Sequence, residues 1–563
     1  MVCIHVIKAD ISCQMYDHWY YVYMHVDIIP NRKSRPCALV RESFRENGKV
    51  KHRTLLNISN EPPERIMAIK RALRGDFDGV GSGGSESIRT EQGPQFGALH
   101  VLARIAKEMG LVQALGSDRK GRLALLLVVA QVIAGMSRRA VVQWARNQAI
   151  HEVLGLGNED RLGFDEHDLY EVLDDLADRR FHIESDLFRI RGKQCNRLFL
   201  YDVTSSYLEG RCNDLADWGY NRDGKKGKKQ IVIGLLTDKD GDPVAVDVFK
   251  GNTSDPTTVI DQIRRLTDRF GVSDVVFVGD RGMLKSVPLE SIDKAGFHYI
   301  TAITKPQIES LISQGVFQLN LFDEALGEME SGGIRYVFRR NPVRVLEIED
   351  SRRERIEKAR DFARKLSEGL AASARKSVEV AARRINEKVT ALKIDRFVTV
   401  KTDGRTISVD PDPESYEKKS RLDGVYVLKT DLRASELEAD EVHRVYKSLS
   451  QVETDFRTMK TELQVRPVHV RRESRTRGHV LVVMLALMVR RDLDKRLREL
   501  DICVTHALDA LNGWTVLRES LGSIRFSRLP DPNPLQMEIL GALGVKLPTS
   551  LSIYSKRGRQ KTA

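Results

Sequence analysis

The sequence predicts an α/β protein of several domains, built around one mixed β-sheet. Three observations lead to this prediction. A chain of 563 residues is too long to enclose a single hydrophobic core. Residues 197–303 combine five short β-rich runs with two helical segments. Residues 95–190 instead carry apolar residues at helical spacing, for example Leu99, Leu102, Ile105 and Met109.

Composition narrows the class of protein and its partners. The chain has 91 Lys and Arg against 79 Asp and Glu, a net charge of +12, which favours a polyanionic partner such as nucleic acid. Its six cysteines are scattered without zinc spacing, as is typical of a reduced, intracellular protein. The longest apolar runs, 123–134 and 480–489, are too short to span a bilayer and predict buried helices. We therefore expect a cytoplasmic protein with no membrane contact.

Changes in pattern along the chain predict six segments. They are an N-terminal β segment with a Gly/Ser linker (1–90), a helical region expected to bind DNA (91–195), the first part of the α/β core (196–305), an inserted subdomain (306–435), the second part of the core with a long helix (436–500), and a helical C-terminal region with a basic tail (501–563).

The α/β core carries the most informative order of elements. Predicted strands cover residues 197–203, 229–237, 243–249, 274–279 and 298–303, and Asp240-Gly241 marks a hairpin between the second and third. Ser254-Asp255-Pro256 begins a helix after the third strand, and a shorter helix ends near Ala295. The order β-β-β-α-β-α-β is that of the ribonuclease-H-like fold.

In that fold, carboxylates on the first strand, at the end of the fourth strand and on a later helix perform the chemistry. Asp202 lies on the first predicted strand, and Asp280 ends the fourth. An Asp at a strand end is also a common turn or cap residue, so both interpretations remain open for each residue alone. Their placement in one fold order, together with the helix described next, favours the catalytic interpretation.

The segment 446–463 predicts a helix with an apolar stripe formed by Leu449, Val452, Phe456, Met459 and Leu463. Tyr446, Glu453, Arg457 and Lys460 form a polar row beside this stripe. The row is either a solvated salt-bridge face or a carboxylate placed among phosphate-binding groups.

Cleavage of a DNA phosphodiester bond requires a nucleophilic oxygen and stabilisation of charge on the phosphate and the leaving oxygen. Two Mg²⁺ ions about 3.5–4 Å apart supply these, and Mg²⁺ prefers carboxylate and water oxygens. Asp202, Asp280 and Glu453 would meet if the apolar stripe packs the helix on the sheet. They are the predicted ligands of Mg²⁺, with Mn²⁺ as the alternative.

The sequence resembles the DDE-type insertion-sequence transposases that carry a Y-R-E-K signature. Tyr446, Glu453 and Lys460 occupy three of its four positions, and Leu449 stands at the Arg position. The closest subgroup reads Y-x-x-L-x-x-V-E-x-x-F-R-x-x-K, in which Arg457 is the substitute basic residue. Further matching motifs are DVTS (202–205), GYNRD (219–223), GNTSD (251–255), VGDRG (278–282) and RPVH (466–469).

The resemblance runs from about residue 24 to 500. Residues 1–23 fall outside it, and we expect them to come from an upstream start codon; detection of Met1 in the native protein by mass spectrometry would refute this.

The resemblance implies a transposase that cleaves the ends of an insertion sequence and joins the freed 3′-OH strands to target DNA. Asp202, Asp280 and Glu453 would hold the metal ions. Tyr446, Arg457 and Lys460 would contact phosphates of the element's end, with Arg281 next to a catalytic carboxylate. A homodimer would bring two ends together, and the protein would be associated with the nucleoid.

Other expectations come from the residues themselves. The loop 222–229, RDGKKGKK, is either a phosphate contact through Arg222, Lys226 and Lys228 or a solvated hairpin. Trp218 either stacks on an unpaired base or is a core or rim aromatic. Two other functions remain open: an inactive DNA-binding relic of a transposase, and a ribonuclease-H-like DNA nuclease.

Overall fold

The computed structural model divides into two compact units, Met1–Val172 with Val489–Ala563 (unit 1) and Leu173–Met488 (unit 2). Each is described by itself. The structure describes residues 23–31, 36–46, 49–73, 89–158, 161–192, 198–210, 212–220, 222–254, 270, 275–279, 297–317, 326–521, 524–546 and 553–555.

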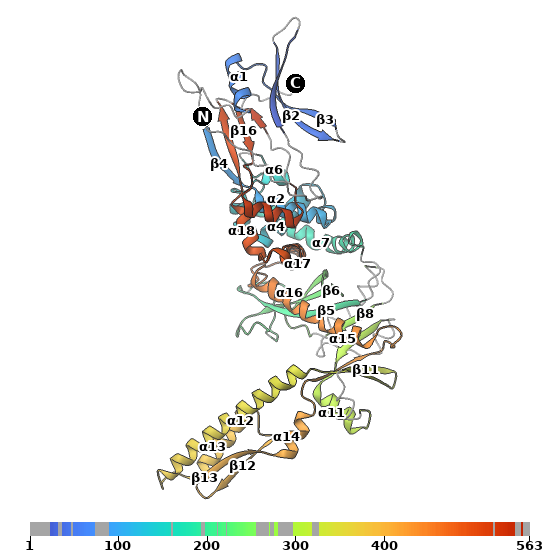
Figure 1. Ribbon diagram of the computed structural model, residues 1–563, viewed down its shortest axis with the longest axis vertical. Coiled ribbons are helices and arrows are strands. Elements are labelled where there is room, and N and C mark those ends of the chain that lie inside the picture. The colour runs from blue at the N-terminus through green and yellow to red at the C-terminus, as the bar shows by residue number, and fades with distance from the viewer. Residues whose placement is uncertain are drawn as a thin grey trace, which may run out of the picture. The chain divides into compact units, whose positions relative to one another are not determined.

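Unit 1 consists of helices and two antiparallel sheets (Figure 1). Its elements, including two long helices that continue across the unit boundaries, are β1 (Tyr23–Ile29), β2 (Cys37–Glu46), β3 (Lys49–Asn57), α1 (Pro63–Ala72), β4 (Arg89–Gln95), α2 (Gly97–Glu108), α3 (Leu111–Leu115), α4 (Arg119–Ala134), α5 (Arg138–Ala145), α6 (Ile150–Leu154), α7 (Glu166–Ile190), α17 (Glu473–Leu497), η2 (Arg498–Leu500), α18 (Val504–Asn512), β15 (Thr515–Leu521), β16 (Ile524–Arg528), α19 (Pro534–Leu543) and β17 (Ile553–Ser555).

The predicted helices of residues 95–190 are present. Of the predicted stripe, Leu99, Leu102 and Ile105 are buried in α2, and Met109, directly after the helix, is half-buried. The C-terminal region, expected to be helical, also contains strands. β15 pairs with β4, so strands more than 400 residues apart in the sequence share one sheet. No single described helix is long and apolar enough to cross a membrane; α4 and α5, bent by 93°, meet that requirement only as a pair.

Unit 2 contains an eight-stranded mixed sheet in the order β10-β11-β14-β9-β8-β5-β6-β7. Its elements are β5 (Leu198–Tyr207), β6 (Gln230–Asp238), β7 (Pro243–Lys250), β8 (Val276–Gly279), β9 (His298–Ala302), α11 (Lys305–Ser313), β10 (Leu326–Ser331), β11 (Ile334–Arg340), α12 (Pro342–Ala371), α13 (Val378–Ala391), β12 (Val398–Asp403), β13 (Thr406–Pro411), α14 (Pro413–Ser420), β14 (Val425–Thr430), α15 (Ala439–Lys447) and α16 (Leu449–Thr461).

The five strands predicted for the core are confirmed as β5 to β9. β5, β6 and β7 form an antiparallel meander, and β8 and β9 continue the sheet in parallel from β5. The predicted hairpin joins β6 to β7, where Gly241 has a φ of 77° that a side chain would disfavour. The two helices expected after β7 and β8 lie largely outside the described residues, as do most of the Gly/Ser linker and the basic tail.

The range 306–435, expected to be an inserted subdomain, divides into two parts. β10, β11 and β14 belong to the eight-stranded sheet, where β14 pairs with both β11 and β9. The helices α12 and α13 pack with the two-stranded sheet β12–β13 around a separate cluster that includes Ile356, Ala363 and Ile385. Residues 351–394 are rich in charged side chains, and they form a pair of helices that buries an apolar stripe.

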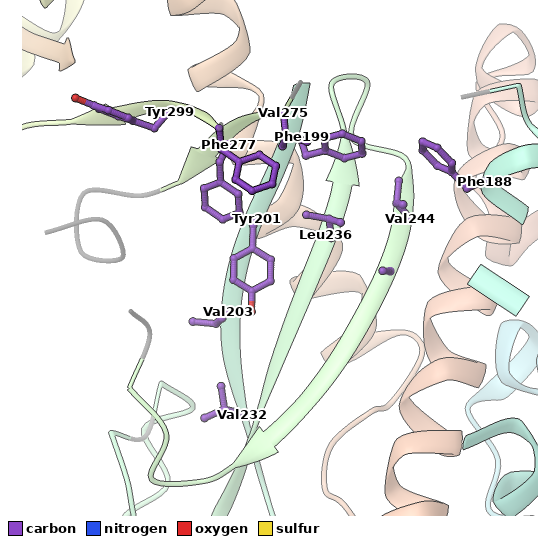
Figure 2. Packing of buried hydrophobic residues seen from close by; sticks show 12 residues of the cluster. Phe188, Phe199, Tyr201, Val203, Val232, Leu236, Val244, Val275, Phe277 and Tyr299 are labelled. Carbon is purple, nitrogen blue, oxygen red and sulfur yellow. The ribbon is translucent and has the colours of Figure 1, made fainter. Parts of the chain in front are cut away.

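The core of the large sheet explains how β5 presents its side chains. Phe199, Tyr201 and Val203, at alternate positions of β5, face a cluster that also contains Phe277 of β8 and Phe188 of α7 (Figure 2). The centroid of the Tyr201 ring lies 5.7 Å from the centroid of the Phe277 ring. Because side chains alternate along a strand, Asp202 points to the opposite face of the sheet.

Tyr201 packs against Gly234 of β6, which lies two residues from Leu236, the cross-strand partner of Tyr201. A Cβ atom on Gly234 would lie 2.2 Å from the Tyr201 hydroxyl oxygen and 2.8 Å from Cζ. We predict that Gly234→Ala lowers the free energy of unfolding by about 1–3 kcal/mol, because the ring must move within a packed core. Denaturant unfolding of the whole chain measures the loss.

The control combines Gly234→Ala with Tyr201→Phe, which removes the atom nearest to the added methyl group. The glycine substitution should cost less in that background. An equal cost in both backgrounds would contradict the predicted clash. Gly541→Ala in α19, where nothing lies within 4 Å of the added Cβ, should not destabilise the chain.

Candidate active site

Asp202 is half-buried on β5, on the sheet face opposite the aromatic cluster. Its Oδ1 accepts a 2.8 Å hydrogen bond from the backbone N–H of Val203. Buried residues on both sides fix its backbone, so the carboxylate projects from a rigid strand.

The parallel strand β8 ends beside this position. Tyr201 pairs with Gly279, the last residue of β8. Asp280 follows Gly279 in the sequence, but Asp280 and Arg281 lie outside the described residues. The structure thus describes the strand that leads to Asp280 and leaves the predicted positions of these two side chains untested.

Four of the five residues of the predicted apolar stripe are buried. Val452, Phe456 and Met459 are buried on α16, which packs on β5 (Figure 1), and Leu463 is buried two residues after the helix ends at Thr461. The helix is divided, however: α15 ends at Lys447 and α16 begins at Leu449, with Ser448 between them. Tyr446 and Glu453 therefore belong to different helices.

Asp202 and Glu453 line one cavity of about 710 Å³ in unit 2. Tyr446 and the half-buried Leu449 line it as well. The packing of α16 on β5 therefore places two carboxylates, far apart in the sequence, at the same hollow. Its full lining is Asp202, Arg339, Arg340, Asn341, Pro342, Tyr426, His443, Tyr446, Lys447, Leu449, Ser450 and Glu453.

Basic side chains line this cavity together with the two acids. Arg339 and Arg340 end β11, and Lys447 ends α15; we call these three residues the cationic wall. Burial, with Arg339 and Lys447 nearby, lowers the pKa of His443, which favours the neutral imidazole. Sequence analysis missed the cationic wall; its one local signal is the Arg-Arg pair at the end of a β-rich run.

Two carboxylates at one hollow are the hard oxygen donors that Mg²⁺ prefers. Among the residues that the structure describes, no group of three His, Cys, Asp or Glu side chains is arranged to hold a metal ion. The donors present, Asp202 and Glu453, fit a divalent cation that takes its remaining ligands from water and from a further acid.

Lys460, predicted to contact DNA, forms an ion pair within the protein. Its Nζ donates to Oδ1 of Asp223 at 2.8 Å, and Arg466 donates to the same oxygen at 2.6 Å. Only 1% of the Asp223 side chain is exposed. Burial lowers the pKa of Lys460, and the Asp223 carboxylate opposes this shift.

The other predicted DNA contacts lie on α16 and on the β5–β6 connection. Arg457 is exposed on α16, and Lys226 is exposed in the loop. Lys228 pairs with Glu209 at 2.9 Å. The guanidinium of Arg222 lies 5.7 Å from the ring centre of Tyr220. None of these four side chains lines the cavity that contains Asp202 and Glu453.

Unit 1 has a separate cavity of about 960 Å³ in the region expected to bind DNA. Arg146, Arg161 and Arg518 line it together with polar side chains such as Asn147. Unit 1 therefore offers a second concave surface, in which these three arginines lie together with the acidic residues Glu152 and Asp165.

Comparison with protein families identifies the family of the chain. The family model of the transposase DDE domain matches residues 193–489, and the model of the N-terminal domain of IS1634 family transposases matches residues 26–83. No curated protein matches the sequence. The first match contains β5, β8 and α16, and it covers more than half of the chain. The protein therefore belongs to the DDE transposases of insertion sequences.

Proposed function

We propose that the protein cleaves the ends of an insertion sequence and transfers the freed 3′-OH strands to target DNA. The observation that carries this proposal is the cavity shared by Asp202 and Glu453, which the cationic wall also lines. Carboxylates suit metal-dependent phosphoryl transfer, and arginines suit the phosphates of DNA. Because two ends must react together, we propose a homodimer as the active form.

Asp202, Asp280 and Glu453 are the proposed ligands of two Mg²⁺ ions within a ribonuclease-H-like core. Held by these carboxylates, Mg²⁺ would supply activation of the attacking oxygen and neutralisation of charge on the phosphate and the leaving oxygen. Asp202 offers a carboxylate held on a packed strand, and Glu453 offers one on the helix that packs against it. Asp280 is included because it follows directly after Gly279, the last residue of β8. Gly279 pairs with Tyr201, the residue before Asp202.

The cationic wall has the proposed role of holding phosphates next to these carboxylates. Arg339 donates to Nδ1 of His443 at 3.2 Å, which fixes one guanidinium at the edge of the cavity. Tyr446 lines the same cavity and can donate its hydroxyl to a phosphate oxygen. Arg457 is a proposed contact farther along the DNA, as are the cavity residues of unit 1.

We predict that Asp202→Asn and Glu453→Gln each reduce strand cleavage by about 10²- to 10³-fold or more, the size of loss that follows removal of one group stabilising transition-state charge. The amides keep the shape of each side chain but lose the negative charge that binds a cation. Cleavage of a labelled DNA end in Mg²⁺ measures the rate, and a gel-shift assay measures end binding.

Glu462→Gln is the matched control, because Glu462 is an exposed carboxylate at the end of the same helix and does not line the cavity. Its cleavage rate should stay near that of the unchanged protein. Full cleavage by the Glu453→Gln protein, or loss of end binding together with cleavage in both cavity variants, would refute the proposed roles.

We predict that Arg340→Ala weakens binding of duplex DNA and lowers the slope of log affinity against log salt by about 0.9, the value for one lost phosphate contact. Titrations at several salt concentrations measure this slope. Arg353→Ala is the control, because Arg353 lies on α12, pairs with Glu349 and does not line the cavity. Equal slopes for the two variants would exclude Arg340 as a phosphate contact.

A further inference from the structure

The connection between β5 and β6 exposes two aromatic rings among basic side chains. Trp218 is 59% exposed and Tyr220 is 81% exposed, which makes them the most exposed aromatic side chains in the described part of the chain. The basic residues Arg222, Lys225 and Lys226 follow within six residues of Tyr220. We call these five residues the aromatic–basic surface.

The backbone beneath these rings is held firmly. The buried side chain of Gln230 donates to the carbonyl oxygens of Tyr220 and Gly251 at 3.1 and 2.9 Å. Gly219 lies against Gly251, where a Cβ atom would come within 2.1 Å of the Gly251 carbonyl oxygen. Asp217 and Gln230 exchange two backbone hydrogen bonds of 3.0 Å. The two rings are thus exposed on a backbone that cannot shift easily to bury them.

The same connection is tied to the helix that carries Glu453. Asp223 accepts hydrogen bonds from Lys460 and Arg466, and its other oxygen accepts one from the backbone N–H of Tyr207 at 3.2 Å. Lys460 lies seven residues after Glu453 on α16, a rise of roughly 10 Å. The aromatic–basic surface therefore has a fixed attachment close to the proposed catalytic helix.

We propose that the aromatic–basic surface binds unpaired bases of the DNA substrate by stacking on Trp218 and Tyr220. Every base has a flat π-face, so exposed rings bind single strands with little sequence preference, and neighbouring cations hold the backbone phosphates. A basic loop alone would bind duplex and single strands through phosphates only. The two rigidly presented rings are what favour an unpaired strand over a duplex.

This inference rests on the proposed function only in taking DNA as the ligand, and it names the form of DNA that the surface selects. Its test uses the full chain in chelating buffer, so that no cleavage occurs. The probes are a single-stranded oligonucleotide of about 16 nucleotides, within the range that one stacking domain covers, and the duplex of the same sequence. A 2-aminopurine base in the single strand reports stacking through loss of its fluorescence.

Trp218→Ala and Tyr220→Ala should each weaken single-strand binding by about 5- to 150-fold. Duplex affinity should change by less than about 2-fold, because the phosphate contacts remain. Trp218→Phe should retain most single-strand affinity, since it keeps an aromatic face. Lys226→Ala, the control, should weaken both complexes alike and reduce their salt dependence.

Equal losses for single strand and duplex in the alanine variants, or no loss in either, would overturn the proposal. The unchanged protein gives an independent test: 2-aminopurine that stays fully fluorescent in the complex would also overturn it. The Glu453→Gln variant should bind the single strand normally. Loss of cleavage therefore tests the proposed function, and loss of single-strand binding tests this inference, so the two can fail separately.

Discussion

The packing of α16 on β5 is the interaction on which the proposed active site depends. Val452, Phe456 and Met459 of α16 are buried, and burial of each contributes up to about 1.5–3 kcal/mol. This burial holds α16 on β5 and so keeps Glu453 and Asp202 at one cavity, although their like charges repel each other. The site is assembled by hydrophobic burial beside it.

The alternation of side chains along β5 determines which face of the sheet presents Asp202. Odd-numbered positions of β5 supply Phe199, Tyr201 and Val203 to the aromatic cluster, which leaves Asp202 on the other face. A shift of one residue in the pairing of β5 would bury the carboxylate among aromatic rings. The close approach of Tyr201 to Gly234 opposes such a shift, since the ring fits only where β6 has no side chain. A packing contact on one face of the sheet thus fixes the position of Asp202 on the other.

The sequence predicted the parts of this structure that local signals determine. Apolar runs and the Asp240-Gly241 turn located β5 to β9, and helical spacing located the stripe of α16. It did not predict the cationic wall, because Arg339 reaches the cavity only through the pairing of β11 with β14 and of β14 with β9, which links segments distant along the chain. The division of the helix at Ser448 also escaped prediction, since the apolar spacing continues through it.

The basic residues of unit 2 differ in how their charge is used. Some form ion pairs with buried carboxylates within the protein, and others line the cavity, where they can bind DNA. Lys460 matches a position of the family signature, yet its charge is directed to Asp223, which has almost no access to solvent. Removing one partner of a buried ion pair is costly, so this lysine stabilises the attachment of the β5–β6 connection whether or not it also reaches a phosphate. Arg340 and Lys447 differ from it because they line the cavity itself. Matching a motif therefore identifies a residue's place in the fold, and the burial of its partner determines how much of its charge a ligand can use.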